Sequence, residues 1–398
     1  MKTQIAMLYD RSETDELGIQ LTAEQMGVEL GFLPFHKVAL GFDSGDFTYR
    51  SLGKDYTEEL RDVRVVLNRA QSKSRRMFAA SILGALGKDV LNPFPVELNC
   101  QSKIRALLAF ASRDVLIPKT VYVPCNTVER VGGGGVHDNS EVVSRLIAEQ
   151  MGSDRVVVKP DAGTHGMGVS LSESMEDLQG LLRGVVPSVT NPVGVVAQEL
   201  IPKWFYDLRI IVRKERGRPP SCHRNALARG GFKEFRTNTF LGNMVFRARL
   251  PAEVMRQAEV CAEALGEGGE AWVIALDAMP WIGDDLREGE EEVRSSITAL
   301  DEPFREVTRV KRLPSKKRNF AGYTRAITEA YEGYMATEAY ALVESVVNET
   351  LEKAWGSVYF HEGNACPEFW EQTRVVAGVN PAEDMLRCAQ GLLDARGG

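Results

Sequence analysis

The sequence predicts a mixed α/β (α+β) fold in three parts: an N-terminal parallel α/β domain, a small central domain, and a C-terminal domain built on an antiparallel sheet. Strand-like and helix-like segments alternate through roughly the first hundred residues, which is typical of a mainly parallel sheet covered by helices. Farther along, apolar strand-like segments follow one another and carry arginines. This second pattern favours an antiparallel sheet.

In the N-terminal part, the pattern predicts strands at residues 5–9, 28–35 and 63–67, and helices at residues 15–26 and 77–86. Residues 101–112 then predict a helix. Ile104, Leu107, Leu108 and Ala111 recur at the spacing of one helical face, so we expect these four side chains to be buried together.

Composition restricts the class of protein. The chain of 398 residues is 44% hydrophobic and 26% charged, ordinary for a globular protein and enough for two or three domains. A formal charge of −7 argues against nucleic acid as an obligatory partner. No secretory leader or membrane-spanning run is evident, so we expect a cytoplasmic protein. The six cysteines form no C-x-x-C pair, which favours neither a zinc site nor a disulfide framework.

Residues 155–169, RVVVKPDAGTHGMGV, give the strongest local signal. A β-branched run ends at Lys159 and opens into a loop with Gly163, Gly166 and Gly168. Glycines let backbone N–H groups approach phosphate oxygens, and a lysine at the strand end can reach the same oxygens. The spacing fits neither the Walker loop nor the Rossmann fingerprint. By itself, the segment is equally compatible with a structural hairpin.

A second patch begins where the apolar strand at residues 193–197 ends in Gln198-Glu199-Leu200-Ile201. The backbone of such a hinge can pair with an adenine edge, and Glu199 can accept a hydrogen bond from the amino group. Asp207 follows, close enough to bond a ribose hydroxyl or to orient Arg209. The alternative for Asp207 is an ordinary solvated charge.

The remaining candidates are guanidinium groups and oxygen ligands. Arg209, Arg224 and Arg236 suit bidentate capture of carboxylate or phosphate, although each could be an ordinary surface arginine. Three residues offer the hard oxygen atoms that Mg²⁺ prefers beside a polyphosphate: Asp277, Glu362 and Asn364. For Asn364 a capping role is the alternative. His361 and Cys366 also suggest a Cys/His nucleophile, but their places beside Glu362 and Asn364 explain them more simply.

Taken in this order, the motifs VVVKP…G..G.GV, QE.I….D.R, R..N and E.N..P resemble the ATP-grasp superfamily, and within it the RimK-like carboxylate–amine ligases, over about residues 1–375. The resemblance implies a pre-ATP-grasp domain at 1–98, a central lid domain at 99–192 and a C-terminal ATP-grasp domain at 193–398. It implies that Lys103 and Lys159 bind the nucleotide phosphates. It also implies that Asn238 belongs to the nucleotide site and that Arg69 faces the site of the acceptor substrate.

The function that the resemblance implies is ATP-dependent amide or peptide bond formation through an acyl phosphate, with release of ADP and phosphate. ATP and Mg²⁺ are the expected cofactors, and Mn²⁺ can substitute. The partners would be a carboxylate and an amine, such as an amino acid, a peptide or an acidic carrier protein, with no nucleic acid or membrane partner; a homo-oligomer stays open. Two alternatives remain: a small-molecule kinase, for which the basic stretch 305–318 is the best support, and a non-catalytic nucleotide-binding protein.

One departure from the RimK-like pattern concerns the metal ligands. Residues 278–361 separate Asp277 from Glu362, where the family has a short hairpin, so Asp284 or Asp285 could replace Asp277. We expect the insertion, about residues 278–356, to act as a lid or to recognise the acceptor through its basic side chains. These are Arg309, Lys311, Arg312, Lys316, Lys317 and Arg318.

Overall fold

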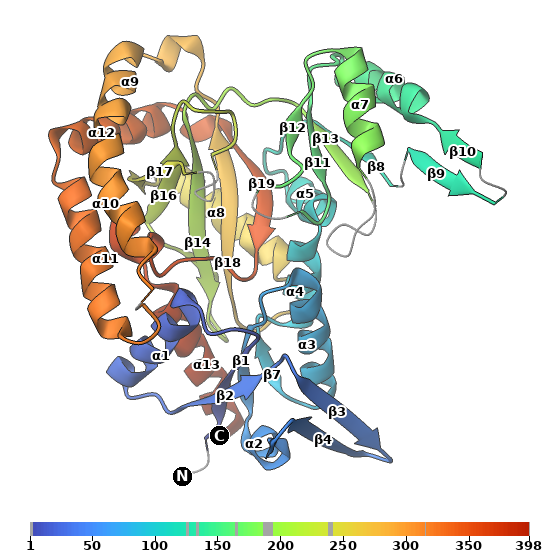
Figure 1. Cartoon of the computed structure of the whole chain (residues 1–398), viewed down its shortest axis with the longest axis vertical. Helices are drawn as coiled ribbons and strands as arrows, with labels where there is room; N and C mark the ends of the chain where they lie inside the picture. The colour runs from blue at the N-terminus through green and yellow to red at the C-terminus, as the bar shows by residue number, and fades with distance from the viewer. Residues whose placement is uncertain are drawn as a thin grey trace.

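The computed structural model describes residues 3–124, 127–132, 135–163, 166–185, 194–237, 242–314 and 316–397. It has the mixed α/β architecture that the sequence predicts, with one parallel and several antiparallel sheets (Figure 1). In the described part of the chain, the helices are too short or too polar to cross a membrane.

The N-terminal sheet is parallel, with strand order β2-β1-β6-β7. Its strands are β1 (Ile5–Tyr9), β2 (Leu30–Pro34), β6 (Val65–Arg69) and β7 (Asp89–Leu91). Side chains alternate between its faces. Ile5 and Met7 pack toward α1 (Thr14–Met26) and α13 (Pro381–Gly397), whereas Ala6 and Leu8 pack toward α2 (Thr57–Asp62) and α3 (Lys73–Ala85). A small sheet that the sequence pattern did not indicate, β3 (Val38–Asp43), β4 (Asp46–Ser51) and β5 (Lys54–Asp55), follows β2.

The central sheet is antiparallel, with strand order β12-β11-β13-β8. Its strands are β8 (Thr120–Val123), β11 (Val157–Pro160), β12 (Ser170–Leu171) and β13 (Val195–Gln198). Helices α6 (Ser140–Met151) and α7 (Met175–Gly184) bury Ile147, Leu178 and Leu182 against it, and the hairpin β9 (Val128–Val131) and β10 (Gly135–Asp138) extends from it (Figure 1). Because β13 is an inner strand, this sheet continues to Gln198, beyond the boundary expected at residue 192.

The C-terminal sheet is antiparallel, with the order β17-β16-β14-β18-β19 and β15 beside β14. Its strands are β14 (Tyr206–Lys214), β15 (Ser221–Cys222), β16 (Asn225–Gly230), β17 (Met244–Arg249), β18 (Trp272–Pro280) and β19 (Val358–Asn364). Three helices, α4 (Phe94–Gln101), α5 (Lys103–Ala111) and α8 (Ala252–Leu265), share its main hydrophobic core. The buried face of α5 differs from the prediction. Lys103, Ala106, Leu107 and Phe110 are buried, whereas Leu108 is 61% exposed.

The insertion between β18 and β19 is helical. Helices α9 (Glu290–Ala299), α10 (Asp301–Lys311), α11 (Phe320–Met335) and α12 (Glu338–Lys353) lie along one side of the C-terminal sheet (Figure 1). They join its core through aromatic side chains such as Tyr334 and Tyr340, which contact Phe246 of β17. The hairpin formed by β18 and β19 is therefore intact, and the insertion extends from its tip.

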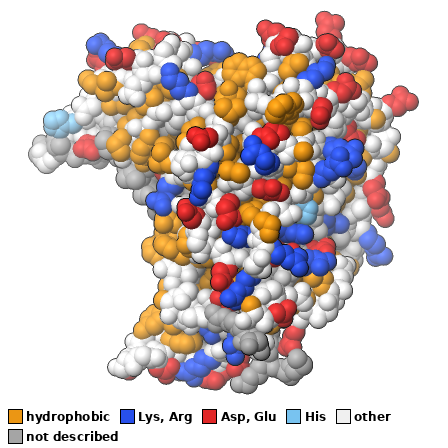
Figure 2. All heavy atoms as spheres, turned by 180° about the vertical axis from the view of Figure 1, so that it is seen from behind, with side chains coloured by type: hydrophobic (Ala, Val, Ile, Leu, Met, Phe, Trp, Pro, Cys, Tyr) orange, Lys and Arg blue, Asp and Glu red, His pale blue; other side chains and the backbone are white. Residues whose placement is uncertain are grey.

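The molecular face shown in Figure 2 carries acidic and basic side chains interspersed with hydrophobic ones.

Candidate active site

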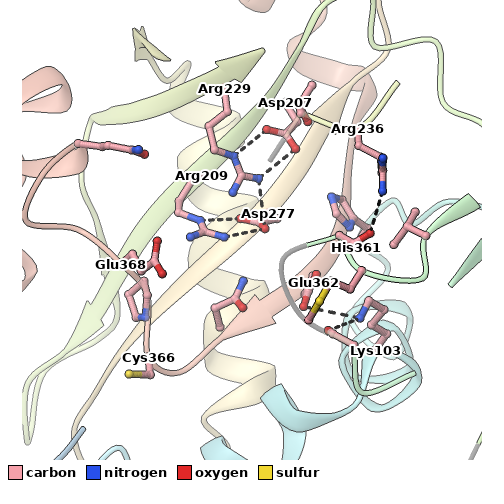
Figure 3. A pocket seen from close by; sticks show the side chains of 18 of the residues that line it. Lys103, Asp207, Arg209, Arg229, Arg236, Asp277, His361, Glu362, Cys366 and Glu368 are labelled. Atoms are coloured by element: carbon pink, nitrogen blue, oxygen red, sulfur yellow. Dashed lines mark hydrogen bonds and ion pairs between the residues drawn. The ribbon is translucent and has the colours of Figure 1, made fainter. Parts of the chain in front are cut away.

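A cavity of about 600 Å³ is lined by residues from all three sheets and their connections. The glycine loop after β11 and the hinge after β13 line one end, and the N-terminus of α1 and the end of β6 line the other. Between them lies one face of β14, β16, β18 and β19, seen in Figure 3. The cavity thus brings together segments that are distant in sequence.

Asp161 fixes the glycine loop to the start of α5. Its carboxylate accepts hydrogen bonds from Ser102 Oγ (2.7 Å) and Ile104 N (2.9 Å), which satisfy polar groups at the helix N-terminus. Lys103 Nζ donates to Gly163 O (2.9 Å) and lies 3.9 Å from Glu362 Oε1. Burial lowers the pKa of Lys103, although the charge of Glu362 opposes the shift.

Lys159 extends from β11 into the same end of the cavity. Its Nζ donates to Gln198 Oε1 (2.7 Å), and Gln198 Nε2 donates to Thr120 Oγ1 (3.0 Å). Burial and the positive charge of Lys103 lower the pKa of Lys159 to about 8. The ammonium groups of Lys103 and Lys159 are thus buried beside the glycine loop and have few anionic partners. Such a site would favour a polyanion.

The loop itself has the backbone conformation that requires glycine. Gly166 and Gly168 have φ values of +71°, a region that residues with a Cβ rarely adopt. At Gly168 a Cβ would also lie 2.8 Å from Pro160 Cγ. Gly163 and Gly166 line the cavity, whereas Gly168 shapes the turn beside it.

The hinge after β13 is anchored by reciprocal bonds with the segment before β8. Glu199 N donates to Lys119 O (3.0 Å), and Lys119 N donates to Glu199 Oε1 (2.7 Å). Glu199, Leu200 and Ile201 all line the cavity. Lys203 follows; its Nζ donates to Thr237 Oγ1 (2.7 Å), and burial lowers its pKa to about 8.

A row of paired charges crosses the face of the C-terminal sheet (Figure 3). Arg229 of β16 binds Asp207 of β14 through two bonds of 2.9 and 3.0 Å. Arg209 of β14 binds Asp277 of β18 in the same way, at 2.9 and 3.0 Å. Arg229 also lies 3.2 Å from Asp277. Burial opposes the ionised form of Asp277, but both arginines outweigh it and hold its pKa well below the ordinary value.

The pairing of β18 with β19 brings the expected metal ligands together. Asp277 is opposite Glu362 and Ala275 is opposite Asn364, with an irregular register that leaves His361 between two pairs. Such a bulge lets consecutive side chains face one side, and both His361 and Glu362 line the cavity. Asp284 and Asp285 do not line it, and the side chain of Asp284 is 96% exposed.

Glu362 is held as a carboxylate by two lysines. Its Oε1 lies 3.4 Å from Lys73 Nζ and 3.9 Å from Lys103 Nζ. Burial would raise its pKa, but the charges of Lys103 and Lys73 prevail and lower it to about 2. Near Glu362, Asn364 Nδ2 is buried without a hydrogen-bond partner among the described residues.

These donors suit Mg²⁺ in one particular way. No group of three or more His, Cys, Asp or Glu side chains in the described residues could hold a metal alone. Mg²⁺, however, is commonly bound by one or two carboxylates together with substrate phosphates. Asp277, Glu362 and Asn364 fit that arrangement, because they offer hard oxygen atoms beside the lysines of the phosphate end.

At the opposite end, the N-terminal layer supplies a buried cluster around Arg69. Arg69 Nε donates to Glu16 Oε1 (3.1 Å), and its Nη2 lies 3.6 Å from Asp15. Burial raises the pKa of Asp15 to about 7, although Arg69 lowers it. Lys316, from the connection between α10 and α11, also lines this end, and its ammonium has no ion pair with a described residue.

Most residues expected to form the site line this one cavity. They are Lys103, Lys159, Gly163, Gly166, Glu199, Leu200, Ile201, Asp207, Arg209, Arg236, Asp277, Glu362 and Asn364. Gln198 does not line the cavity, but its side chain accepts a hydrogen bond from Lys159. Arg224, in contrast, is exposed and lines a different hollow. Asn238 lies outside the described residues.

The sequence pattern did not indicate Arg229, Lys73 or Lys203. Arg229 had a detectable signal, because it is a charge within the otherwise apolar strand segment Asn225–Gly230. Cys366 and His361 do not form an activated pair: burial raises the pKa of Cys366, and burial lowers the pKa of His361 to about 4. Both shifts disfavour a thiolate–imidazolium nucleophile.

No protein-family model matches this sequence, but solved structures resemble the fold over nearly all of both chains. D-alanyl-alanine synthetase A from Vibrio cholerae is 10% identical, with a TM-score of 0.58 over 99% of each chain. D-cycloserine synthetase DcsG is 12% identical, with a TM-score of 0.56 over 98% of this chain and 99% of its own. The ATP-grasp ligase PsnB, with its minimal precursor, is 12% identical, with a TM-score of 0.53 over 99% of each chain. The chain therefore has the ATP-grasp fold.

Proposed function

We propose that this protein is an ATP-dependent ligase that joins a carboxylate to an amine. One observation carries the proposal: a single cavity is lined by Lys103, Lys159 and the glycine loop, which suit a nucleotide polyphosphate, and also by Arg69 and Lys316, which suit a second substrate. A reaction between bound ATP and a second substrate needs such a continuous but differentiated space. The ligases and synthetases that share the fold support the same class of reaction.

The nucleotide would lie between the central and C-terminal sheets. The hinge Glu199–Ile201 would offer backbone groups to adenine, and Asp207, which lines the same cavity and is paired with Arg229, would bind the ribose. Lys103, Lys159 and the loop amides would bind the phosphates, whose negative charge would restore favourable partners to both buried ammonium groups. Arg236, whose Nη1 donates to Gly166 O (3.3 Å), would bring a further cation to the loop.

Asp277, Glu362 and Asn364 would hold Mg²⁺ against the phosphates. The same oxygen ligands accept Mn²⁺. When bound, the metal ion supplies neutralisation of the charge that develops during phosphoryl transfer. Lys73 and Lys103 keep Glu362 ionised and orient it, while Arg209 and Arg229 do the same for Asp277.

The chemistry proceeds in two balanced steps. A substrate carboxylate oxygen bonds to the γ-phosphorus of ATP, and the bond from that phosphorus to the β–γ bridging oxygen breaks, which gives an acyl phosphate and ADP. The amine nitrogen then bonds to the acyl carbon, the carbon–oxygen bond breaks, and phosphate leaves with an oxygen of the former carboxylate, while the proton that the nitrogen loses passes to the leaving phosphate or to water. Arg209 and Arg229 face this space and would stabilise the developing oxyanion. Arg224 lies outside the cavity and has no part in this proposal.

The kinase alternative loses its main support in the structure. Arg309 pairs with Glu306 on its own helix, Lys317 pairs with Glu13, and Lys311 lies 4.0 Å from Glu371. Within the basic stretch 305–318, Lys316 is the described residue that lines the cavity. One such lysine does not make the basic pocket that a polyphosphorylated acceptor needs.

The test is a screen of amino acids and short peptides, singly and in pairs, for release of ADP and inorganic phosphate in the presence of ATP and Mg²⁺. The proposal predicts equal amounts of ADP, phosphate and an amide identified by mass spectrometry, all dependent on two substrates. A phosphorylated product formed without free phosphate would establish the kinase instead. Glu362→Gln is the control for contaminating activity.

A further inference from the structure

A second hollow of about 650 Å³ lies away from the candidate active site. It is lined by the connection before β16, the end of β17, α12 and the segment after residue 377. Three arginines contribute to its wall: Arg224, Arg247 and Arg249. None of them lines the active-site cavity, so any ligand here would be distinct from ATP and its acceptor.

Strand pairing explains why the arginines gather. Arg247 and Arg249 are two residues apart on β17 and therefore project from the same face. Arg249 is paired with Asn225 of β16, next to Arg224. Asn348 of α12 donates to Arg247 O and accepts from Arg249 N (2.7 Å), which fixes this edge of the sheet.

The three guanidinium groups are poorly neutralised by the protein. Arg224 and Arg249 make no side-chain hydrogen bond or ion pair with a described residue. Arg247 Nε donates to Val376 O (3.0 Å) and lies 3.8 Å from Glu344. Glu344 is the carboxylate that lines the hollow among the described residues, and burial raises its pKa although Arg247 lowers it.

Other acidic groups nearby are already engaged. Asp384, next to His223 of this hollow, bonds both His223 Nε2 (2.7 Å) and Arg213. Lysines in such a cluster could lose protons, but arginines remain charged in proteins. The three arginines are exposed at the wall of the hollow and stay charged, and a tetrahedral oxyanion offers oxygens to several guanidinium groups at once.

One short segment of the chain runs from the active-site cavity to the hollow. Phe369, Glu371 and Gln372 line the active-site cavity, and Gly378 and Val379 line the hollow. Between them is a π-helical turn, η4 (Thr373–Ala377), a rare conformation that is frequent at functional sites. Two side chains that line the hollow hold this turn. Arg247 Nε donates to Val376 O, and Asn225 Nδ2 donates to Ala377 O (3.1 Å).

We propose that the hollow formed by Arg224, Arg247 and Arg249 is a binding site for a phosphoryl-type oxyanion, separate from the active site and connected to it through η4. The occupant is either inorganic phosphate or the phosphoryl group of a small metabolite. The inference does not depend on the reaction proposed above.

The experiment titrates the full-length protein with sulfate and with inorganic phosphate by calorimetry, while saturating AMP-PNP and Mg²⁺ occupy the active site. The test variant is Arg224→Gln/Arg249→Gln. The matched control is Arg145→Gln/Arg256→Gln, which removes the same charge from two exposed arginines that pair within their own helices. Hydrogen exchange with and without sulfate localises the binding. A further titration with glycerol 3-phosphate distinguishes the two sources of phosphoryl group.

We expect one anion to bind, at least tenfold more weakly in the test variant and unchanged in the control, with slower exchange at residues 373–379. Glycerol 3-phosphate that binds tighter than phosphate would indicate a metabolite, and equal affinity would indicate inorganic phosphate. Equal losses in both variants would show a general charge effect and overturn the proposal. Protection confined to the glycine loop, or no binding to the wild type, would overturn it as well.

Discussion

ATP affinity is expected to fall as pH rises above about 8, and Lys159 is a main cause. Burial and the charge of Lys103 lower the pKa of Lys159 to about 8, and its partner Gln198 is neutral. A phosphate oxygen at the same place favours the ammonium form, so nucleotide binding raises the pKa and takes up a proton. Because the bound form holds the proton more tightly, affinity is highest below the free pKa and declines above it.

The size of the effect follows from the shift. If phosphate restores the ordinary value of 10.5, the change is roughly 2.5 units, or about 3 kcal/mol at 1.36 kcal/mol per unit. That is the largest contribution that titration of Lys159 can make to the free energy of ATP binding. Between about pH 7.5 and about pH 9, the same shift lowers the association constant roughly eightfold.

The assay is calorimetric titration with AMP-PNP and Mg²⁺ at both pH values, in buffers of different ionisation enthalpy. Wild-type protein should take up protons on binding. Lys159→Met should bind AMP-PNP more weakly and take up fewer protons. The proton uptake that remains would come from Lys203, whose pKa is also about 8. Lys159→Arg keeps a charge that does not titrate in this range, so it should bind with the same reduced uptake. The reasoning is refuted if both variants keep the full pH dependence of the wild type.

Three further predictions concern single side chains. Glu362→Gln should lower turnover by roughly a hundredfold or more with little change in nucleotide affinity, measured by ADP release and by titration; equal turnover would contradict its role. Asp277→Asn should destabilise the fold, by roughly 3–5 kcal/mol if the charge of its arginine partners is left uncompensated, and abolish turnover, whereas the exposed Asp284→Asn should change neither, as thermal melting and rates would show. Lys316→Ala should raise the acceptor KM while Arg318→Ala does not, since Arg318 is exposed and does not line the cavity; a matching rise in both would remove Lys316 from the site.

Local pattern predicted the parts of the fold that depend on neighbours in sequence. The strand at Ile5–Tyr9 and the strand ending at Lys159 have the apolar runs of buried strands, and both form as expected. The small sheet at residues 38–55 was missed because its strands are short and mostly exposed, so that only a few alternate side chains, such as Val38, Leu40 and Tyr49, pack against the core.

The pairing of strands that are distant in sequence could not be predicted from local sequence pattern. The distance in sequence between Asp277 and Glu362 suggested that Asp284 or Asp285 could be the ligand. In the structure, the insertion folds into helices beyond the hairpin tip, so the register of β18 and β19 is retained. Nothing in the local pattern of residues 278–361 specifies that register.

The arginines illustrate the same limit. Arg224 and Arg229 are five residues apart, and which one reaches the cavity depends on where β16 pairs with β14. The register places Arg229 opposite Asp207 and leaves Arg224 beyond the end of the strand, in the second hollow. On α5, packing on both sides buries Lys103 along with Phe110, which hydrophobic periodicity alone would not predict.

The acyl phosphate is the central claim, and oxygen transfer tests it most directly. Once the screen identifies a carboxylate substrate, that acid is prepared with ¹⁸O in both carboxyl oxygens and converted with ATP and the amine. The account predicts one ¹⁸O atom in each molecule of released phosphate, because the carboxylate oxygen that attacks the γ-phosphorus leaves with it. Unlabelled phosphate, with one label kept in the amide and the other released as water or on another product, would contradict the account.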